Sequence, residues 1–258
     1  MGEYYFVNAA LPPLSFGQKP ELSFHELKEM LHENLSASDL KKVGYLLRPI
    51  DLANIRAFWM GIPMDVKGNY TPKELEEVLL VKDPLPEYLI DFLDRYDTTE
   101  QRLHYFSSLY VSLYRDTQEK LDGFLFQYYM FEREVRLVLA ALRAKKMKRD
   151  VVRELQFEDP TDTIVTDILA QKDSPDYTPP QEYEDLKELF VRHADNPKAL
   201  QRAVLEYRFA KYEELTENQF FSLDRILSYL ARLMIVESWD SLDAEKGKAL
   251  IEDLSKYG

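Results

Sequence analysis

The apolar residues of this 258-residue chain recur at intervals of three or four positions along much of its length. Such intervals place side chains on one face of an α-helix. The pattern is clearest in segments 131–142 and 223–236. It predicts buried faces made of Phe131, Val135, Leu137, Val138, Leu139 and Leu142 in the first segment, and of Leu223, Ile226, Leu227, Leu230, Leu233 and Met234 in the second. We therefore predict a nearly all-α fold with about ten helices.

Several short motifs mark where helices are expected to begin. Ser23 is followed three residues later by Glu26, the spacing of a capping box in which two side chains satisfy exposed backbone N–H groups. Thr71 and Glu74 repeat this spacing around Pro72, a residue well tolerated at the first helical position. Three further starts are expected at Asp159–Pro160, at Asn196–Pro197 and at Thr216 with Gln219.

Prolines and turn-forming residues mark the expected breaks between helices. We expect breaks at Arg48–Pro49, at Asp83–Pro86 and at Asp173–Pro180, where three prolines make the best candidate for a linker. Alternation of apolar and polar residues, the pattern of a half-buried strand, is scarce, and Tyr4–Val7 is its best candidate.

Three segments of the chain share the same order of parts. Each has an arginine directly after a small or β-branched apolar residue, then a mostly apolar run, and these arginines are Arg56, Arg136 and Arg232. A further helical segment follows each of them, at 71–80, 160–169 and 243–254. We interpret this order as three helical units, 1–82, 83–172 and 173–258, in one continuous helical body. The alternative is that unrelated amphipathic helices share these features by chance.

Composition narrows the class of protein. The chain is 45% hydrophobic and 31% charged with only 8 glycines, which favours a globular helical protein. It has no cysteine, which excludes disulfides, thiolate zinc sites and cysteine catalysis, and fits a reducing compartment. The first residues have no basic flank, and no run approaches the roughly 20 apolar residues that span a bilayer. We expect a cytoplasmic protein.

The formal net charge of −13 argues against nucleic acid as a partner and against direct contact with anionic lipid, because both would repel the chain. If the protein works at a membrane, another protein must hold it there. Residues 131–155 are the exception, since eight basic residues against four acidic ones leave this stretch at +4.

Most of that positive charge lies directly behind the apolar run of 131–142. A helix C-terminus favours nearby cations by about 0.3–1 kcal/mol each, but five cations within seven positions exceed what one helix end needs. We predict that they form a contact surface for an acidic protein partner. The alternative is a set of solvated charges. The predicted partner-binding residues are Arg143, Lys145, Lys146, Lys148 and Arg149.

The arginines that mark the repeats have a different expected role. An arginine beside an apolar stripe commonly lays its stem along the core edge and pairs with a nearby carboxylate. We therefore predict that Arg56, Arg136 and Arg232 are structural residues that fix the packing of the units.

No catalytic site is expected. The chain has no phosphate-binding glycine motif and no nucleophile elbow. His25, Glu29 and His32 share one helical face, but the two histidines are about 10.5 Å apart along a helix, which is too far for one metal ion. We expect no cofactor, no metal and no small-molecule ligand.

The repeated segments also resemble one known family, the C (or d) subunit of V-type and A-type rotary ATPases. Its recurring phrase has an acidic residue, an N-[IVL]-R step, a long apolar face and a basic end. Here "DLANIRAFWMG" (51–61) and "EREVRLVLAALRAKKM" (132–147) are similar to it, and "SYLARLMIVES" (228–238) is less so, because no basic end follows Arg232. The opening "YYFVNAALPPLSFG" (4–17) resembles a short bacterial branch of that family.

The resemblance implies a funnel of three pseudo-repeated helical units. It implies a non-enzymatic central-stalk subunit that couples the rotor shaft to the membrane ring carrying protons or sodium ions. Its partners would be the other stalk subunits and the ring, which would place the protein peripherally on the membrane. The alternatives are an unrelated helical scaffold that binds an acidic protein and, less favoured, an enzyme whose site is assembled from scattered residues.

Overall fold

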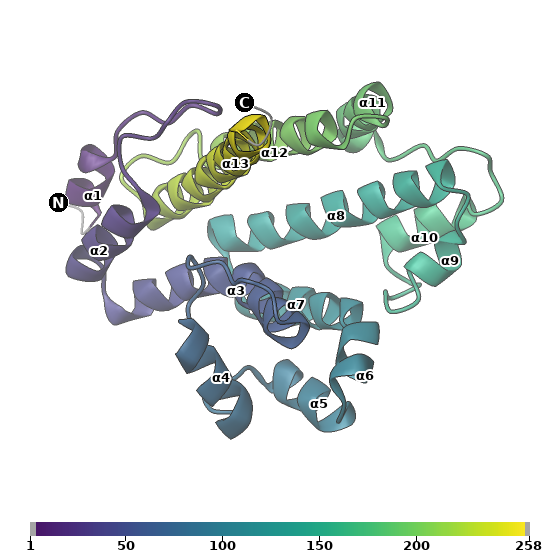
Figure 1. Ribbon diagram of the computed structural model, residues 1–258, viewed down its shortest axis with the longest axis horizontal. Helices are drawn as coiled ribbons and strands as arrows, with labels where there is room; N and C mark the ends of the chain where they lie inside the picture. The colour runs from purple at the N-terminus through teal and green to yellow at the C-terminus, as the bar shows by residue number, and fades with distance from the viewer. Residues whose placement is uncertain (1–3, 256–258) are drawn as a thin grey trace. The chain divides into compact units, whose positions relative to one another are not determined.

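The computed structural model describes residues 4–255, and the side chains of residues 4–241 (Figure 1). All regular structure in this range is helical, which confirms the all-α prediction. The helices are α1 (Tyr5–Ala10), α2 (Phe24–Asn34), α3 (Ala37–Met60), α4 (Pro72–Val81), α5 (Glu87–Arg95), α6 (Thr99–His104), α7 (Ser107–Lys120), α8 (Gly123–Lys146), α9 (Val151–Glu154), α10 (Thr163–Ala170), the 3-10 helix η1 (Gln181–Tyr183), α11 (Glu184–His193), α12 (Pro197–Glu214) and α13 (Leu223–Ser255).

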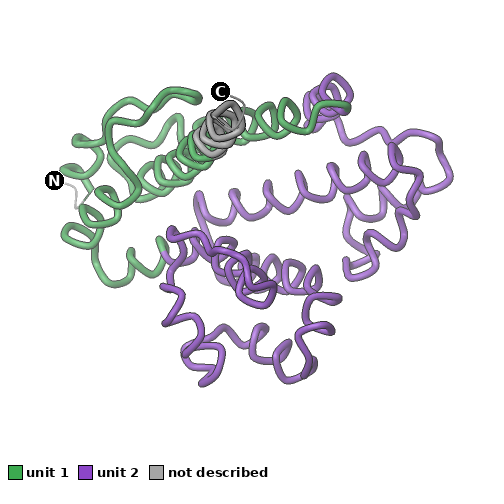
Figure 2. Tube along the Cα trace, viewed as in Figure 1, with its two compact units in different colours: residues 1–43, 195–258 green, residues 44–194 purple. Residues whose placement is uncertain are grey.

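The helices gather into two compact units (Figure 2). One consists of residues 1–43 and 195–258, where α12 packs along α13 and α13 also contacts α1 and α2. The other consists of residues 44–194, where α8 contacts α7, α9, α10 and α11. The division into 1–82, 83–172 and 173–258 stays a prediction.

Three of the expected helix starts are confirmed. At α2 the backbone N–H of Ser23 donates to Glu26 at 2.8 Å, and the N–H of Glu26 donates to the Ser23 hydroxyl at 3.3 Å. Thr71 and Glu74 form the same capping box at α4, with Pro72 as the first helical residue. Asn196 caps α12 by accepting from the N–H of Ala199 at 3.1 Å. These starts depend only on neighbouring residues, which is why the sequence reveals them.

The start expected at Asp159–Pro160 is wrong by three residues. Asp159 accepts from the N–H of Thr161 at 2.8 Å and so closes a turn instead of a helix. Asp162 is the cap of α10, because its carboxylate accepts from the N–H groups of Ile164 and Val165 at 3.1 and 3.3 Å. Both aspartates suit a cap, and the tertiary contacts of Asp162 decide between them.

The start expected at Thr216 is also wrong. Its hydroxyl donates back to the carbonyl of Glu213 in the turn that follows α12. The cap of α13 is Ser222, whose hydroxyl accepts from the N–H of Arg225 at 3.1 Å. α13 then continues to Ser255. The segment 243–254, expected as the helix that completes the third unit, is therefore part of α13.

The candidate strand Tyr4–Val7 is wrong, because these residues begin helix α1. The N–H and the side-chain amide of Asn8 donate to the carbonyl of Tyr4 at 3.1 and 2.9 Å. Val7 is fully buried, while Tyr5 and Phe6 are exposed. Packing of this short helix on α2 and α13 outweighs the strand preference of its aromatic residues.

The break expected at Arg48–Pro49 is also wrong, because Pro49 lies inside α3. Proline has no N–H, so it leaves the carbonyl four residues earlier without its helical donor. That carbonyl belongs to Tyr45, and the hydroxyl of Tyr129 donates to it at 2.6 Å. A side chain from α8 thus supplies the missing hydrogen bond. The break at Asp83–Pro86 is confirmed between α4 and α5, and Asp173–Pro180 lies in the loop between α10 and η1.

Candidate functional site

The predicted partner-binding residues lie at and just after the C-terminal end of α8, and much of this helix is buried. Val135, Val138, Leu139 and Leu142 are at most 5% exposed, which confirms the predicted apolar face. Residues on other sides of the helix are buried as well, because α7, α9, α10 and α11 all contact it. α8 is therefore a fixed axis of residues 44–194, and it holds the basic residues at its end in a defined place. The additional buried residues are Ala141 and Ala144.

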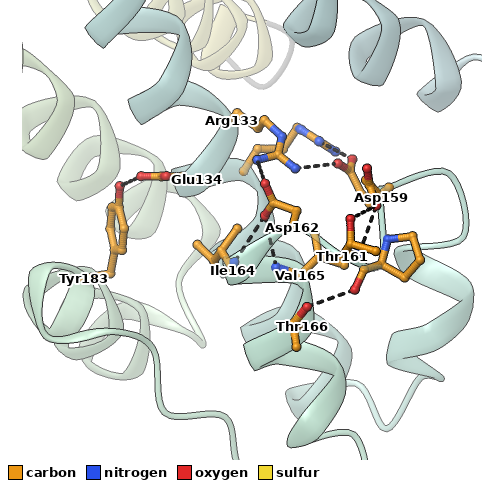
Figure 3. A network of polar contacts seen from close by, with 12 residues as sticks. Arg133, Glu134, Asp159, Thr161, Asp162, Ile164, Val165, Thr166 and Tyr183 are labelled. Carbon is orange, nitrogen blue, oxygen red and sulfur yellow. Dashed lines mark hydrogen bonds and ion pairs between the residues drawn. The ribbon is translucent and has the colours of Figure 1, made fainter. Parts of the chain in front are cut away.

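A buried ionic network ties the middle of α8 to the loop before α10 (Figure 3). The Glu158 side chain is 3% exposed and pairs with two arginines of α8, Arg133 at 3.4 Å and Arg136. Arg133 also pairs at 3.0 Å with Asp162, the carboxylate that caps α10. The side chains of Glu158 and Arg133 are buried in this network, whereas those of Arg136 and Asp162 are only partly buried.

A second tie joins α8 to η1. The Tyr183 hydroxyl donates to the Glu134 carboxylate (Figure 3). Burial raises the pKa of Glu134, and the hydrogen bond from Tyr183 opposes this shift in part.

The end of α8 has the backbone geometry of a Schellman motif. The N–H of Arg149 donates to the carbonyl of Ala144 at 2.8 Å, and the N–H of Lys148 donates to that of Lys145 at 3.1 Å. The motif needs one residue in the left-handed region, which is usually glycine. Here that residue is Lys148, with a φ of 53°. A side chain with a Cβ is disfavoured there, so the chain keeps a cation where glycine would fit better.

Lys145 differs from the other basic residues of this cluster. Its ammonium group donates to the carbonyls of Gln171, Lys172 and Ser174 at 2.7, 2.6 and 2.7 Å. These carbonyls follow the end of α10, where backbone acceptors have no helical donors. Lys145 therefore fastens the end of α8 to the end of α10, and its charge is directed into the protein.

The other four residues form an exposed basic surface, which we define as Arg143, Lys146, Lys148 and Arg149. Arg149 lies 3.7 Å from Glu154, but both side chains are well exposed, so this pair contributes little to stability. Met147 lies within this run of cations and Val152 follows it on α9, and the two side chains are 59% and 46% exposed. Exposed apolar side chains among cations are typical of a surface that another protein covers. Met147 and Val152 were not among the predicted contact residues, although an apolar residue inside the basic run is a visible signal in the sequence.

The three repeat-marking arginines all lie close to aromatic rings. The guanidinium carbon of Arg56 lies 5.8 Å from the ring centre of Phe106, and that of Arg136 lies 5.3 Å from Tyr114. Burial raises the pKa of Tyr110, whose ring centre lies 5.8 Å from that of Phe106, and the charges of Arg56 and Arg136 oppose that shift.

Arg232 has a comparable environment in the other compact unit. Its guanidinium carbon lies 5.3 Å from the ring of Phe209, and it pairs with Glu213 at 2.6 Å. Burial lowers the pKa of Arg232, and Glu213 opposes the shift. Arg136 and Arg232 thus each have a carboxylate partner, whereas Arg56 is exposed. Whether the three mark related units stays a prediction.

Across the described range, no helix is both long and apolar enough to cross a membrane. The described side chains also include no group of three or more acidic or histidine residues placed to share a metal ion.

The fold and this site define an all-helical protein that displays a small basic surface on an acidic chain. The chain belongs to the DUF2764 family, described as "Protein of unknown function", which it matches over residues 1–257. It is 32% identical over 262 residues to an uncharacterized protein of Chlamydia muridarum, with 99% of this chain and 98% of the relative covered. Relatives in Chlamydia trachomatis and Chlamydia pneumoniae, also described as uncharacterized, are 32% identical with the same coverage. No solved structure matches the chain.

This membership corrects the resemblance drawn from the repeated segments. The chain was expected to be similar to the C (or d) subunits of rotary ATPases, and the family that it matches along nearly its whole length is a different one. The phrase that suggested the resemblance consists of an arginine, an apolar helical face and a basic helix end. Any buried helix with a capped, charged end can carry those features.

Proposed function

We propose that this protein is a non-enzymatic helical adaptor that docks the exposed basic surface at the end of α8 onto an acidic surface of a partner protein. The surface consists of Arg143, Lys146, Lys148 and Arg149, with Met147 and Val152 as its apolar contacts. No catalytic role is included, because the sequence has no recognisable catalytic motif.

The observation that carries the proposal is the conformation of Lys148. Its φ of 53° is one that glycine adopts at little cost and lysine does not. Folding alone would favour glycine there, so a lysine at this position points to a use for its charge. Lys145 is not included in this surface, because its ammonium group is bound to backbone carbonyls.

Electrostatics further supports an acidic protein partner. The net charge of −13 repels polyanions such as nucleic acid at long range, but a local group of cations still attracts a compact acidic patch at short range. A rigid support also favours binding, because little conformational freedom is lost when α8 is already fixed by the Glu158 network.

A more specific proposal of the same kind is that the protein couples the rotor shaft to the membrane ring of a rotary ATPase. It includes the funnel of three pseudo-repeated units and a peripheral position in the cytoplasm. This proposal is supported by the repeated order of Arg56, Arg136 and Arg232, each near an aromatic ring. The family to which the chain belongs does not support it. Recovery of stalk subunits with the tagged protein from its source cells would support it, and an eluate without them would count against it.

The adaptor function is tested by affinity capture from the source cells with a variant in which Arg143, Lys146, Lys148 and Arg149 are all changed to Glu. We expect the specific partners of the wild type to be lost. The matched control changes four exposed cations elsewhere, Lys19, Lys41, Lys73 and Arg192, to Glu, and should keep them. Equal recovery of partners by both variants would overturn the proposal.

A further inference from the structure

Four exposed aromatic side chains lie where α1 meets the segment before α13, on the unit made of residues 1–43 and 195–258. Two belong to α1 and two to the segment just before α13, more than 200 positions later in the chain. They are Tyr5, Phe6, Phe220 and Phe221, and they are 56%, 62%, 70% and 48% exposed. We refer to these four residues as the aromatic patch. The basic surface of α8 lies in the other compact unit.

The patch is held in place by specific contacts. The rings of Tyr5 and Phe221 lie 4.7 Å apart. The side-chain amide of Asn8 donates to the carbonyls of Tyr4 and Ser222 at 2.9 and 3.2 Å, which links α1 to the segment before α13. Phe221 has a φ of 55°, which is costly for an aromatic residue. Residues held in such conformations are concentrated at functional sites.

Charges of both signs flank Phe220 and Phe221 in the sequence. The guanidinium carbon of Arg225 lies 5.9 Å from the ring of Phe220, and Arg225 is exposed. Glu217, three residues before Phe220, is exposed too. Among the described side chains, neither Arg225 nor Glu217 forms an ion pair. Each therefore has its charge available for another molecule.

We propose that the aromatic patch is the interface for a second copy of this chain, in a reversible two-fold dimer. A two-fold axis through the patch brings the patch of each chain onto that of its copy. In the dimer that we propose, Arg225 of each chain lies against Glu217 of the other, so that opposite charges meet twice. A partner of one charge sign would match only one of these two residues.

The size of the patch sets the expected strength. A fully buried aromatic side chain covers about 150–250 Å², so the exposed parts of these four rings offer on the order of 350–600 Å². Stable dimers bury roughly 800 Å² per partner, and smaller interfaces are transient. We therefore expect a dimer with a dissociation constant on the order of micromolar.

The test is sedimentation equilibrium of the full chain over a range of concentrations. We expect a monomer–dimer equilibrium in the wild type, and at least about tenfold weaker association in the double variant Phe6→Ser, Phe220→Ser. The control is Val66→Ser, Leu80→Ser, which removes two apolar side chains that are 86% and 83% exposed in the other unit. This control should associate like the wild type.

A charge exchange tests the geometry. Arg225→Glu and Glu217→Arg should each weaken self-association, and an equal mixture of the two variants should restore it as a mixed dimer. Arg225→Glu also places a carboxylate three residues after Ser222, which suits the start of α13.

The proposal is overturned if the wild type stays monomeric at about 100 μM, roughly a hundred times the expected dissociation constant. It is also overturned if the serine variant dimerises as the wild type does, or if the mixture shows no recovery. A wild type that is monomeric but floats with phosphatidylcholine vesicles would assign the patch to lipid instead. None of these variants changes residues 143–149, so the outcome is independent of the adaptor proposal.

Discussion

At the scale of single residues, Lys148 at the end of α8 and Glu158 against its middle have opposite roles. Lys148 occupies a conformation that costs folding energy and presents a charge to solvent. Glu158 is 3% exposed in its side chain and pairs with two arginines of α8. The first is expected to matter for binding and the second for stability.

Replacement of Lys148 by Gly separates these two effects. We expect Lys148→Gly to stabilise the protein by about 1 kcal/mol, because glycine adopts the left-handed region freely, and to weaken partner binding. Lys148→Ala is the matched control, since it removes the same charge and keeps the strain. Denaturant unfolding of the three proteins measures the difference, and a Gly variant no more stable than the Ala variant would contradict this interpretation.

Glu158→Gln is expected to destabilise the protein by about 3 kcal/mol, because the buried Arg133 and the partly buried Arg136 would be left without their shared carboxylate. Glu154→Gln is the control for the same chemical change at an exposed ion pair, and should cost less than about 1 kcal/mol. Urea unfolding gives both values. Equal effects of the two changes would show that the network contributes no more than a surface pair.

The raised pKa of Glu134 makes the stability of the protein depend on pH. Burial raises the pKa of Glu134 in the folded protein above its usual 4.5, so the folded state holds this proton more tightly than the unfolded state does. The contribution of Glu134 to stability is complete below its usual pKa and is lost as the pH rises through the folded pKa.

Glu134→Gln removes this titration and keeps an acceptor for Tyr183. The variant should therefore gain stability relative to the wild type as the pH rises from about 4 to about 7. Unfolding free energies at the two pH values test this, and a constant difference between variant and wild type would contradict it.

At the scale of helices, the motifs that involve close neighbours in sequence predicted structure correctly. The capping boxes at Ser23 and Thr71 are examples, because all their partners lie within one turn. The break predicted at Pro49 is wrong because a hydroxyl from Tyr129, 84 positions away, donates to the Tyr45 carbonyl. The sequence does not show such a partner.

The helical hydrogen bond that Pro49 removes can be returned by mutation. Tyr129→Phe should cost about 1–3 kcal/mol, because it leaves the partly buried carbonyl of Tyr45 without this donor. In a Pro49→Ala background the N–H of the new alanine can donate to that carbonyl, and the cost should shrink. Unfolding of the two single variants and the double variant forms a double-mutant cycle. If the effects of the two single variants simply add in the double variant, the proposed link between Pro49 and Tyr129 is contradicted.

The candidate site was predictable to a similar extent. The clustering of cations behind an apolar face was visible in the sequence, and the structure places four of the five on the surface. The role of Lys145 was not visible, because its acceptors lie about 26–29 positions later, in the loop after α10. The left-handed conformation of Lys148 was also hidden, since glycine is the usual signal for it.

At the scale of the whole molecule, apolar periodicity and low glycine content were sufficient to predict an all-α protein. The identity of the family was not predictable in this way. The repeated arginines suggested a known family of rotary-ATPase subunits, and the match over residues 1–257 assigns the chain to another. Features set by helix packing recur in unrelated helical proteins, so they identify a fold class more reliably than a family.

The central claim is that the end of α8 binds an acidic partner through its four exposed cations. The most direct measurement is the dissociation constant of the purified partner for wild type and for the variant with Arg143, Lys146, Lys148 and Arg149 changed to Glu, at two salt concentrations. We predict at least about tenfold weaker binding by the variant, and wild-type binding that weakens as salt is added. An unchanged dissociation constant in the variant would contradict the claim.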